Sequence, residues 1–162
     1  MVPHDGMVTF ERFFRDEYPR LVPMLQALLG DRQRAEDVAQ DALAAAQREW
    51  DRVRTLDKPG AWVRRVALNT SSNVRRRRAR EAAALRRIPA APAAAPAAES
   101  DEHLWHLVRR LPEQQRWAVT LFYVDDRPVG EVAGILGCSE GSVKTHLSRA
   151  RATLAEIGRA HV

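Results

Sequence analysis

The sequence of 162 residues predicts an all-α protein made of two small helical domains joined by an Ala/Pro-rich linker. Three observations support this prediction. Apolar residues recur with a helical period through most of the chain. Residues 87–101 are rich in alanine and proline, a composition typical of linkers. Near the C-terminus, two short helical patterns flank a glycine, which predicts a helix-turn-helix. The predicted domains are therefore residues 1–86 and 102–162.

The first domain is expected to open with an amphipathic helix. Its first turns carry four aromatic residues, which are Phe10, Phe13, Phe14 and Tyr18. Leucines continue the helical period beyond Pro19, and Gly30 followed by Asp31 is expected to end the helix. The aromatic spacing is explained by packing, so these residues are expected to belong to the core.

A second helix follows, with the most regular apolar stripe of the sequence. The stripe consists of Ala35, Val38, Ala39, Ala42, Leu43, Ala46 and Trp50. Asp37, Gln40 and Asp41 lie away from it and give the helix an acidic and amide surface. This surface fits a solvated face, because acids are favourable near a helix N-terminus, and it fits a docking surface equally well.

The third long helix is expected to begin near Ala61, after a turn-rich connection. Its inward stripe is predicted to be Val63, Val66, Ala67, Thr70 and Val74. The opposite face carries Arg65, Asn69, Ser72, Asn73 and Arg76. Asparagine is a poor helix former, so two asparagines on an arginine-lined face suggest hydrogen bonds to bases. Trp62, at the start of the helix, could stack on an unpaired base, although a core position is favoured.

Positive charge is concentrated in this part of the chain. Residues 62–87 contain nine arginines and a single acid, Glu81, while the whole chain has a net charge of only +5. A basic segment inside an otherwise acidic chain indicates a local contact with a polyanion, and nucleic acid is the leading candidate. The alternative is a basic tail that binds without specificity.

The second domain is predicted to end in the helix-turn-helix. Pro128 lies near the start of its first helix, Gly137 marks the reversal, and Ser139 caps a second helix at about Glu140 to Ala155. That second helix buries an apolar stripe and presents, on its other face, Ser142, Lys144, Thr145, His146, Ser148 and Arg149. Hydroxyl, amine, imidazole and guanidinium groups without a carboxylate suit phosphates and base edges. A helical hairpin with a solvated face is the alternative.

Several other classes of protein are not supported. The chain has no apolar run of 18 residues and no secretory leader, so a cytoplasmic protein without membrane insertion is expected. Cys138 has no second cysteine for a disulfide or a zinc motif, and His103 and His106 lack further ligands. We therefore expect no metal and no cofactor. No phosphate-binding glycine loop, HExxH motif or cysteine pair is present, so we do not expect an enzyme.

With both halves considered, the chain resembles the extracytoplasmic-function sigma factors of bacterial RNA polymerase, the small two-domain class of the sigma-70 family. In the first domain the resemblance rests on YPRLVPMLQALLGDRQRAEDVAQDAL and KPGAWVRRVALNTSSNVRRRR. In the second it rests on LPEQQRWAVTLFYVDD and EVAGILGCSEGSVKTHLSRARATL. A helix-turn-helix alone would also fit a stand-alone transcriptional repressor or activator. The order of the two halves favours the sigma factor.

The resemblance implies a role for each surface. The first domain would bind core RNA polymerase through Asp37, Gln40 and Asp41. The loop Leu56 to Gly60 and the helix bearing Trp62, Arg65, Asn69, Asn73 and Arg76 would hold the melted minus-10 strand. The outer face of the second helix of the helix-turn-helix would read the minus-35 element of promoter DNA. An anti-sigma factor is expected as a further partner, although the sequence does not identify it.

Overall fold

The computed structural model describes residues 8–85 and 100–160, so most of the predicted linker lies outside the described residues. Every element in these two ranges is a helix, and neither range contains a strand. The prediction of an all-α fold is therefore confirmed.

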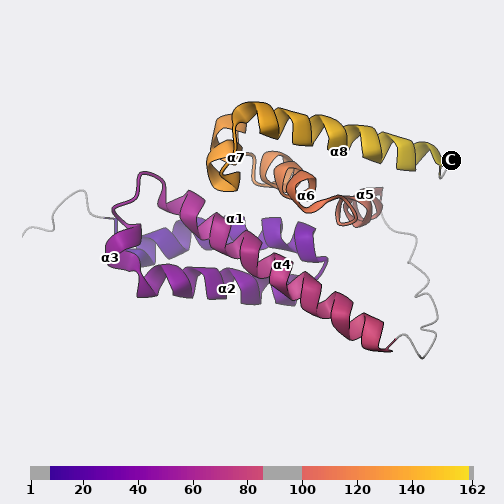
Figure 1. Cartoon of the computed structure of the whole chain (residues 1–162). Coiled ribbons are helices and arrows are strands. Elements are labelled where there is room, and N and C mark those ends of the chain that lie inside the picture. Colours follow the sequence, from indigo (N-terminus) through magenta and orange to yellow (C-terminus); the bar gives the residue numbers. More distant parts are fainter. Residues whose placement is uncertain (1–7, 86–99, 161–162) are drawn as a thin grey trace, which may run out of the picture.

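The first half consists of α1 (Phe10–Leu29), α2 (Arg32–Arg48), the short α3 (Trp50–Val53) and α4 (Pro59–Leu85). Helices α1 and α2 pack side by side, and the long α4 packs against both (Figure 1). Helix α1 continues through Pro19 and Pro23 and ends where predicted. Gly30 there adopts a left-handed conformation with φ 72° and donates its N–H to the carbonyl of Gln26 at 2.8 Å. A residue without a Cβ is favoured at such a position.

The aromatic cluster of α1 is only partly in the core. Phe13 is buried and its ring lies 5.1 Å from that of Trp50, centroid to centroid. Phe14 is 38% exposed and stacks on Tyr18 with centroids 5.3 Å apart. The expectation of a core role is therefore correct for Phe13 and wrong for Phe14, because a helix buries only one stripe against the bundle.

The second half consists of α5 (Ser100–Val108), α6 (Glu113–Val119), the π-helical turn η1 (Thr120–Val124), α7 (Val129–Leu136) and α8 (Glu140–Ala160). Helix α5 starts at Ser100, so the last two residues of the predicted linker are helical. Helices α7 and α8 form the predicted helix-turn-helix, which packs on α6. Helix α8 extends beyond the expected end at Ala155.

The buried face of α4 differs from the predicted stripe. The buried residues are Val63, Arg64, Ala67, Leu68, Ser71 and Ser72. Val66, Thr70 and Val74, which were expected to face inward, are only half-buried. The reason is that α4 is covered from two directions, by α1 and α2 on one side and by α7 on another. The face in contact with protein is therefore displaced from the stripe that a single packing partner would require.

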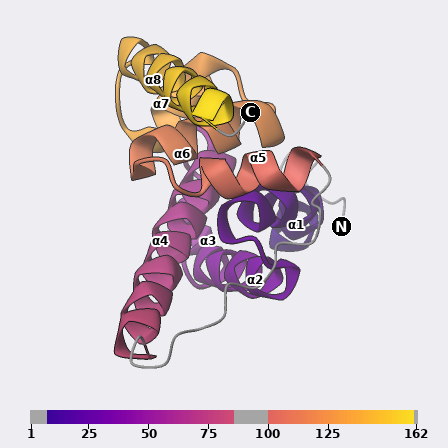
Figure 2. The ribbon, with the colours of Figure 1, turned by 90° about the vertical axis from the view of Figure 1, so that its right-hand side faces the viewer.

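The two halves lie against each other. Helices α5 to α8 form a layer above α1 and the first turns of α4, and the C-terminal end of α4 projects past the bundle (Figures 1 and 2). The contacts between the halves join α4 to α7 and α1 to both η1 and α5. Within residues 8–85 and 100–160, no helix has the length and hydropathy to cross a membrane.

Candidate nucleic-acid interfaces

The helix-turn-helix is held by a glycine reversal and a serine cap. Gly137 has φ 71° and donates its N–H to the carbonyl of Ala133 at 2.9 Å. The hydroxyl of Ser139 accepts the N–H of Ser142 at 3.1 Å and so caps α8. On the inner side Val132 and Ile135 of α7 and Val143 and Leu147 of α8 are buried. Burial of these four residues fixes the orientation of α8, which leaves its other face outward.

The outer face of α8 carries the residues predicted to contact duplex DNA. Lys144, Thr145, Ser148 and Arg149 are exposed, whereas Ser142 and His146 are half-buried. Two hydroxyls on this face are already bonded within the chain. Ser142 accepts a bond from Ser139 at 3.0 Å and Thr145 donates to the carbonyl of Gly141 at 3.0 Å. The two cations of this face differ from these hydroxyls in having no such bond. Neither Lys144 nor Arg149 has a hydrogen bond or ion pair with any residue that the structure describes.

On α4 the predicted minus-10 residues divide into two groups. Asn69, Asn73 and Arg76 are exposed, and Arg76 donates to the amide oxygen of Asn73 at 3.1 Å. Arg65 is half-buried instead and contacts the second half of the chain. Its guanidinium donates to the carbonyl of Leu136 at 3.2 Å and lies 5.4 Å from the centroid of the Trp117 ring.

Trp62 is half-buried and packs against the hydrophobic core. The guanidinium of Arg52 lies 5.8 Å from the centroid of its ring. This position agrees with the core role favoured for Trp62, although the residue is not completely buried.

The acidic surface of α2 is arranged as predicted. Asp37, Gln40 and Asp41 are all exposed and follow one another at helical spacing on one side of α2. Asp37 accepts a hydrogen bond from the side chain of Gln33 at 3.2 Å. The three side chains therefore form one open polar face beside the buried stripe.

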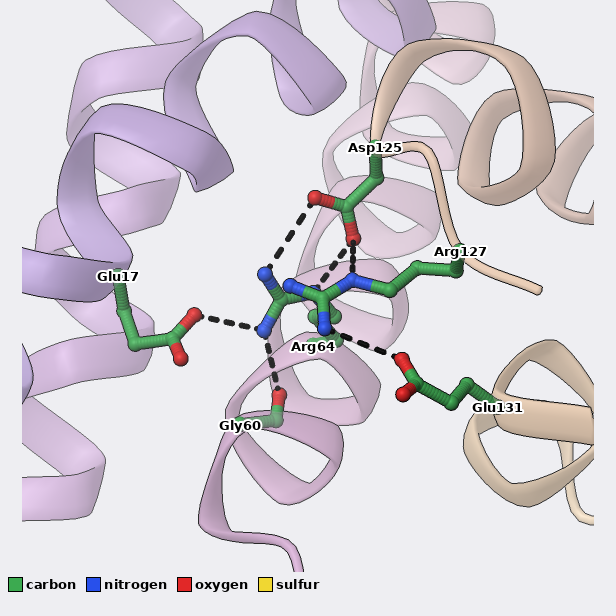
Figure 3. A network of polar contacts seen from close by, with 6 residues as sticks. All are labelled: Glu17, Gly60, Arg64, Asp125, Arg127 and Glu131. Carbon is green, nitrogen blue, oxygen red and sulfur yellow. Dashed lines mark hydrogen bonds and ion pairs between the residues drawn. The ribbon is translucent and has the colours of Figure 1, made fainter.

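The most buried charged group described in the chain is Arg64, for which the sequence predicted no role. It is 1% exposed and lies where the two halves meet (Figure 3). Its Nε donates to Oδ2 of Asp125 at 2.6 Å, and its Nη1 donates to Oε2 of Glu17 at 2.7 Å and to the carbonyl of Gly60 at 2.9 Å. Burial disfavours the charge of this guanidinium, but the hydrogen bonds and charges of Asp125 and Glu17 outweigh burial and raise the pKa of Arg64.

Local backbone geometry brings Asp125 to this position. The π-helical turn η1 ends with the N–H of Asp125 bonded to the carbonyl of Thr120 at 3.1 Å. The next residue, Asp126, has φ 54°, a left-handed conformation that aspartate tolerates better than most residues. The chain then returns so that Arg127 Nε donates to the same Asp125 carboxylate at 3.0 Å, and Arg127 Nη1 donates to Glu131 at 3.2 Å. The carboxylate of Asp125 is therefore shared by two arginines.

A second set of polar contacts joins the halves further along α4. Arg75 donates to the carbonyls of Leu28 and Arg109, at 3.1 and 2.5 Å. Ser72 donates to Oε1 of Glu113 at 2.6 Å. Burial, together with the charges of Arg109 and Arg78, lowers the pKa of Arg75. Ser72, which the sequence placed on the exposed face, therefore belongs to the contact between the two halves.

Sequence reasoning missed this contact because the two sides are far apart in the chain. Arg64 adjoins Arg65 and appears in the sequence as one more member of a basic surface. The one available signal was its helical spacing with Leu68, an apolar residue outside the predicted stripe. Nothing in the local pattern connects it to Asp125, which is 61 residues away.

Two family models match the chain. The one described as "Sigma-70 region 2" matches residues 13–81, and the one described as "Sigma-70, region 4" matches residues 102–154. A relative named RNA polymerase sigma-E factor, from Streptomyces coelicolor, is 29% identical over 152 residues, covering 93% of this chain and 86% of that protein. ECF RNA polymerase sigma factor SigM, from Mycobacterium tuberculosis, is 28% identical over 149 residues, covering 91% of this chain and 76% of that protein.

Two solved structures have a similar fold. The sigma factor RpoE in its complex with the anti-sigma factor NepR, from Bartonella quintana, gives a TM-score of 0.71 at 24% identity, covering 93% of this chain and 96% of that chain. CnrH in its complex with the cytosolic domain of CnrY gives a TM-score of 0.69 at 22% identity, covering 94% of this chain and 89% of that chain. At these identities the likeness establishes the arrangement of helices.

Proposed function

This chain belongs to the extracytoplasmic-function class of the sigma-70 family, and from that membership we propose which of its surfaces carries out each step of transcription initiation. Its function is that of a sigma factor, which binds core RNA polymerase and directs it to promoters. The observation that carries this conclusion is the match to region 2 and region 4 in one chain. A stand-alone repressor would need the second match alone.

The outer face of α8 is proposed to read the minus-35 element. An α-helix fits the major groove of duplex DNA, where guanidinium and amine groups find base acceptors and phosphates. Lys144 and Arg149 are exposed and lack partners within the described parts of the chain, so their charges are available to DNA. Ser148 is exposed beside them, and His146, Thr145 and Ser142 complete this face at lower accessibility or with one bond already made.

The exposed face of α4 is proposed to hold the melted minus-10 strand. Asn69 and Asn73 present amide groups that can pair with the edge of an unstacked base. Arg76 adds charge for the phosphates. Arg65 and Trp62 are proposed to join this site, with Trp62 offering part of a ring on which a base can stack. The segment from Leu56 to Gly60, whose last two residues begin α4, is proposed to border the same face.

The acidic face of α2 is proposed to dock on core polymerase through Asp37, Gln40 and Asp41. Their exposure on one side of a helix supports a rigid contact, because the other side is fixed in the core.

We propose that residues 1–86 and 102–162 act as separate units on polymerase. Sigma factors are not enzymes, so the chain is proposed to act by binding alone. Its proposed location is the cytoplasm. An anti-sigma factor, as in the complex of RpoE with NepR, is proposed as a further partner.

Run-off transcription tests the proposal. Core polymerase is mixed with the purified chain and a library of promoter fragments, and the transcripts are sequenced. We expect transcripts that start at a fixed distance from a shared pair of upstream elements. Binding of the chain alone to duplex operators, with no transcripts when core polymerase is added, would contradict the proposal and favour a repressor.

A further inference from the structure

Helix α7 has a glycine in its first turn, and the side chain of Glu140, the first residue of α8, lies over it. A Cβ built on Gly130 would lie 3.0 Å from Oε1 of Glu140 and 3.9 Å from its Cδ. Glycine inside a helix is unfavourable relative to alanine, because it loses more conformational freedom on folding. At position 130 the missing side chain leaves the space in which the carboxylate of Glu140 rests on α7.

The N-terminus of α7 attracts a negative charge. Its N-cap is Pro128, which makes no side-chain hydrogen bond to the helix. The N–H groups of a first helical turn carry partial positive charge, which a nearby acid stabilises. Glu131 is the acid within the first turn of α7, and its carboxylate is bonded to Arg127 at 3.2 Å. The carboxylate of Glu140 therefore adds a second acid at a helix end that no side chain caps.

The place of Glu140 leaves Lys144 without an ion pair. Lys144 follows Glu140 by four residues, the spacing and the order in which a glutamate and a lysine pair best on a helix. Arg32 and Glu36, at the same spacing but in the less favourable order, do form such a pair at 3.0 Å. Lys144 is exposed and has no hydrogen bond or ion pair within residues 8–85 and 100–160. The contact of Glu140 with α7 explains why the expected pair is missing.

We propose that Gly130 is a positioning residue for the minus-35 contact, because it holds the carboxylate of Glu140 on α7 and so leaves the charge of Lys144 to DNA. This proposal rests on the function proposed for the outer face of α8, and it adds a residue of the neighbouring helix that does not itself touch DNA. An ion pair with Glu140 would have to break before Lys144 could bind a phosphate. A carboxylate beside Lys144 would also repel phosphates, since like charges brought together in an interface are costly.

Gly130→Ala tests the proposal, and Gly134→Ala is the matched control. Both glycines are exposed in α7, but a Cβ at position 134 would meet no atom within 4 Å. The full chain is titrated with the minus-35 duplex identified by run-off transcription, at several salt concentrations. We expect Gly130→Ala to bind several-fold more weakly, and the slope of log K against log salt to become shallower by about 0.9, the contribution of one phosphate contact. Gly134→Ala should change neither quantity.

A substitution of Glu140 separates the effect of charge from the effect of shape. Glu140→Gln keeps the size of the side chain and removes its charge. In the Gly130→Ala background it should restore most of the affinity and of the salt dependence, because an amide does not neutralise Lys144. In the parent chain it should change the affinity far less, because the carboxylate already lies away from Lys144. Equal effects of Glu140→Gln in the two backgrounds would overturn the proposal.

Nuclear magnetic resonance measures the place of Glu140 without DNA. We expect nuclear Overhauser effects between the Hα protons of Gly130 and the Hγ protons of Glu140 in the free parent chain. Their absence would overturn the proposal whatever the binding results, and this measurement decides if Gly130→Ala does not fold.

The two proposals fail in different ways. No binding of the duplex by the parent chain would contradict the role of α8, and with it the consequence proposed for Lys144. Binding by the parent chain that is equally strong and equally salt-dependent in folded Gly130→Ala would support the role of α8 and refute the positioning role of Gly130.

Discussion

The carbonyl of Leu136 accepts a hydrogen bond from Arg65 at 3.2 Å, which joins the end of the first helix of the helix-turn-helix to the helix proposed to hold melted DNA. The two proposed DNA-binding surfaces are therefore connected within the chain through residues adjacent to both. Substitutions on one surface have to be interpreted with the other in mind. Asp37, Asn69 and Lys144 are exposed, so substitutions there test each surface by itself.

Reversing the charge of the acidic face of α2 should abolish binding to core polymerase. In the double variant Asp37→Lys and Asp41→Lys, both changes fall on exposed side chains, so the fold should be retained. Like charges placed in a docking surface cost more than lost contacts at its rim. Asp51→Lys is the control, because Asp51 is exposed but lies on α3. Pull-down of polymerase at the parent level by the folded double variant would remove this face from the docking role.

Removing the cations of α8 should weaken recognition of the minus-35 duplex. We expect Arg149→Ala to cost on the order of 1–3 kcal/mol if it contacts a base, and Lys144→Ala to lower the salt dependence of binding if it contacts a phosphate. Titration of cognate and scrambled duplexes at several salt concentrations separates the two. Arg159→Ala, in the last turn of α8, serves as a control. Unchanged discrimination in Arg149→Ala would exclude base readout by that residue.

Asn69→Ala should impair promoter melting more than formation of the closed complex. The side chain is exposed on α4, so its loss leaves the core intact. A neutral amide adds little to long-range attraction but can pair with a base that has left the stack. Permanganate footprinting on a duplex promoter and on a pre-melted bubble measures the difference. Arg76→Ala should weaken binding to both templates, and an equal defect of Asn69→Ala on both would rule out a specific melting role.

Replacing either of two glycines of the helix-turn-helix by alanine should change the free energy of unfolding, in opposite directions at the two positions. Gly134 is exposed inside α7, and a Cβ there would meet no atom within 4 Å. Gly134→Ala should therefore raise the free energy of unfolding by about 0.5–1 kcal/mol. At Gly137 the φ of 71° is left-handed, so Gly137→Ala should lower the free energy of unfolding by about 1–2 kcal/mol. Chemical denaturation followed by circular dichroism measures both, and the same sign for both variants would contradict this.

The helix ends and exposed faces that the sequence predicted correctly depend on residues that are close together in the chain. The end of α1 at Gly30 and the reversal at Gly137 were predicted because only the backbone conformation of a few residues matters there. The exposure of Asp37 and Asp41 was predictable for the same reason, since a regular apolar stripe fixes the opposite face. The start and the outer face of α8 followed from the cap at Ser139 and the stripe that begins at Val143.

The errors on α4 come from contacts between distant segments. Ser72 and Arg64 are polar residues at positions where a single helix in solution would have no reason to bury them. Each is buried because a partner from the second half, Glu113 or Asp125, satisfies its hydrogen bonds. Arg65, predicted on an open face, is half-buried for the same reason. The periodicity of one helix contains no information about a second packing partner.

The projecting end of α4 has a consequence for the rate at which the chain meets DNA. The helix has 27 residues, which at 1.5 Å per residue is about 40 Å, and its C-terminal end extends past the bundle (Figure 1). The exposed arginines Arg76, Arg77, Arg78 and Arg80 belong to the C-terminal half of the helix. Charges held away from the protein body meet a polyanion before other surfaces do, and they accelerate encounter without regard to sequence. Substitutions at this tip should therefore change the association rate constant. Substitutions at Asn69, nearer the bundle, should change how long the complex lasts.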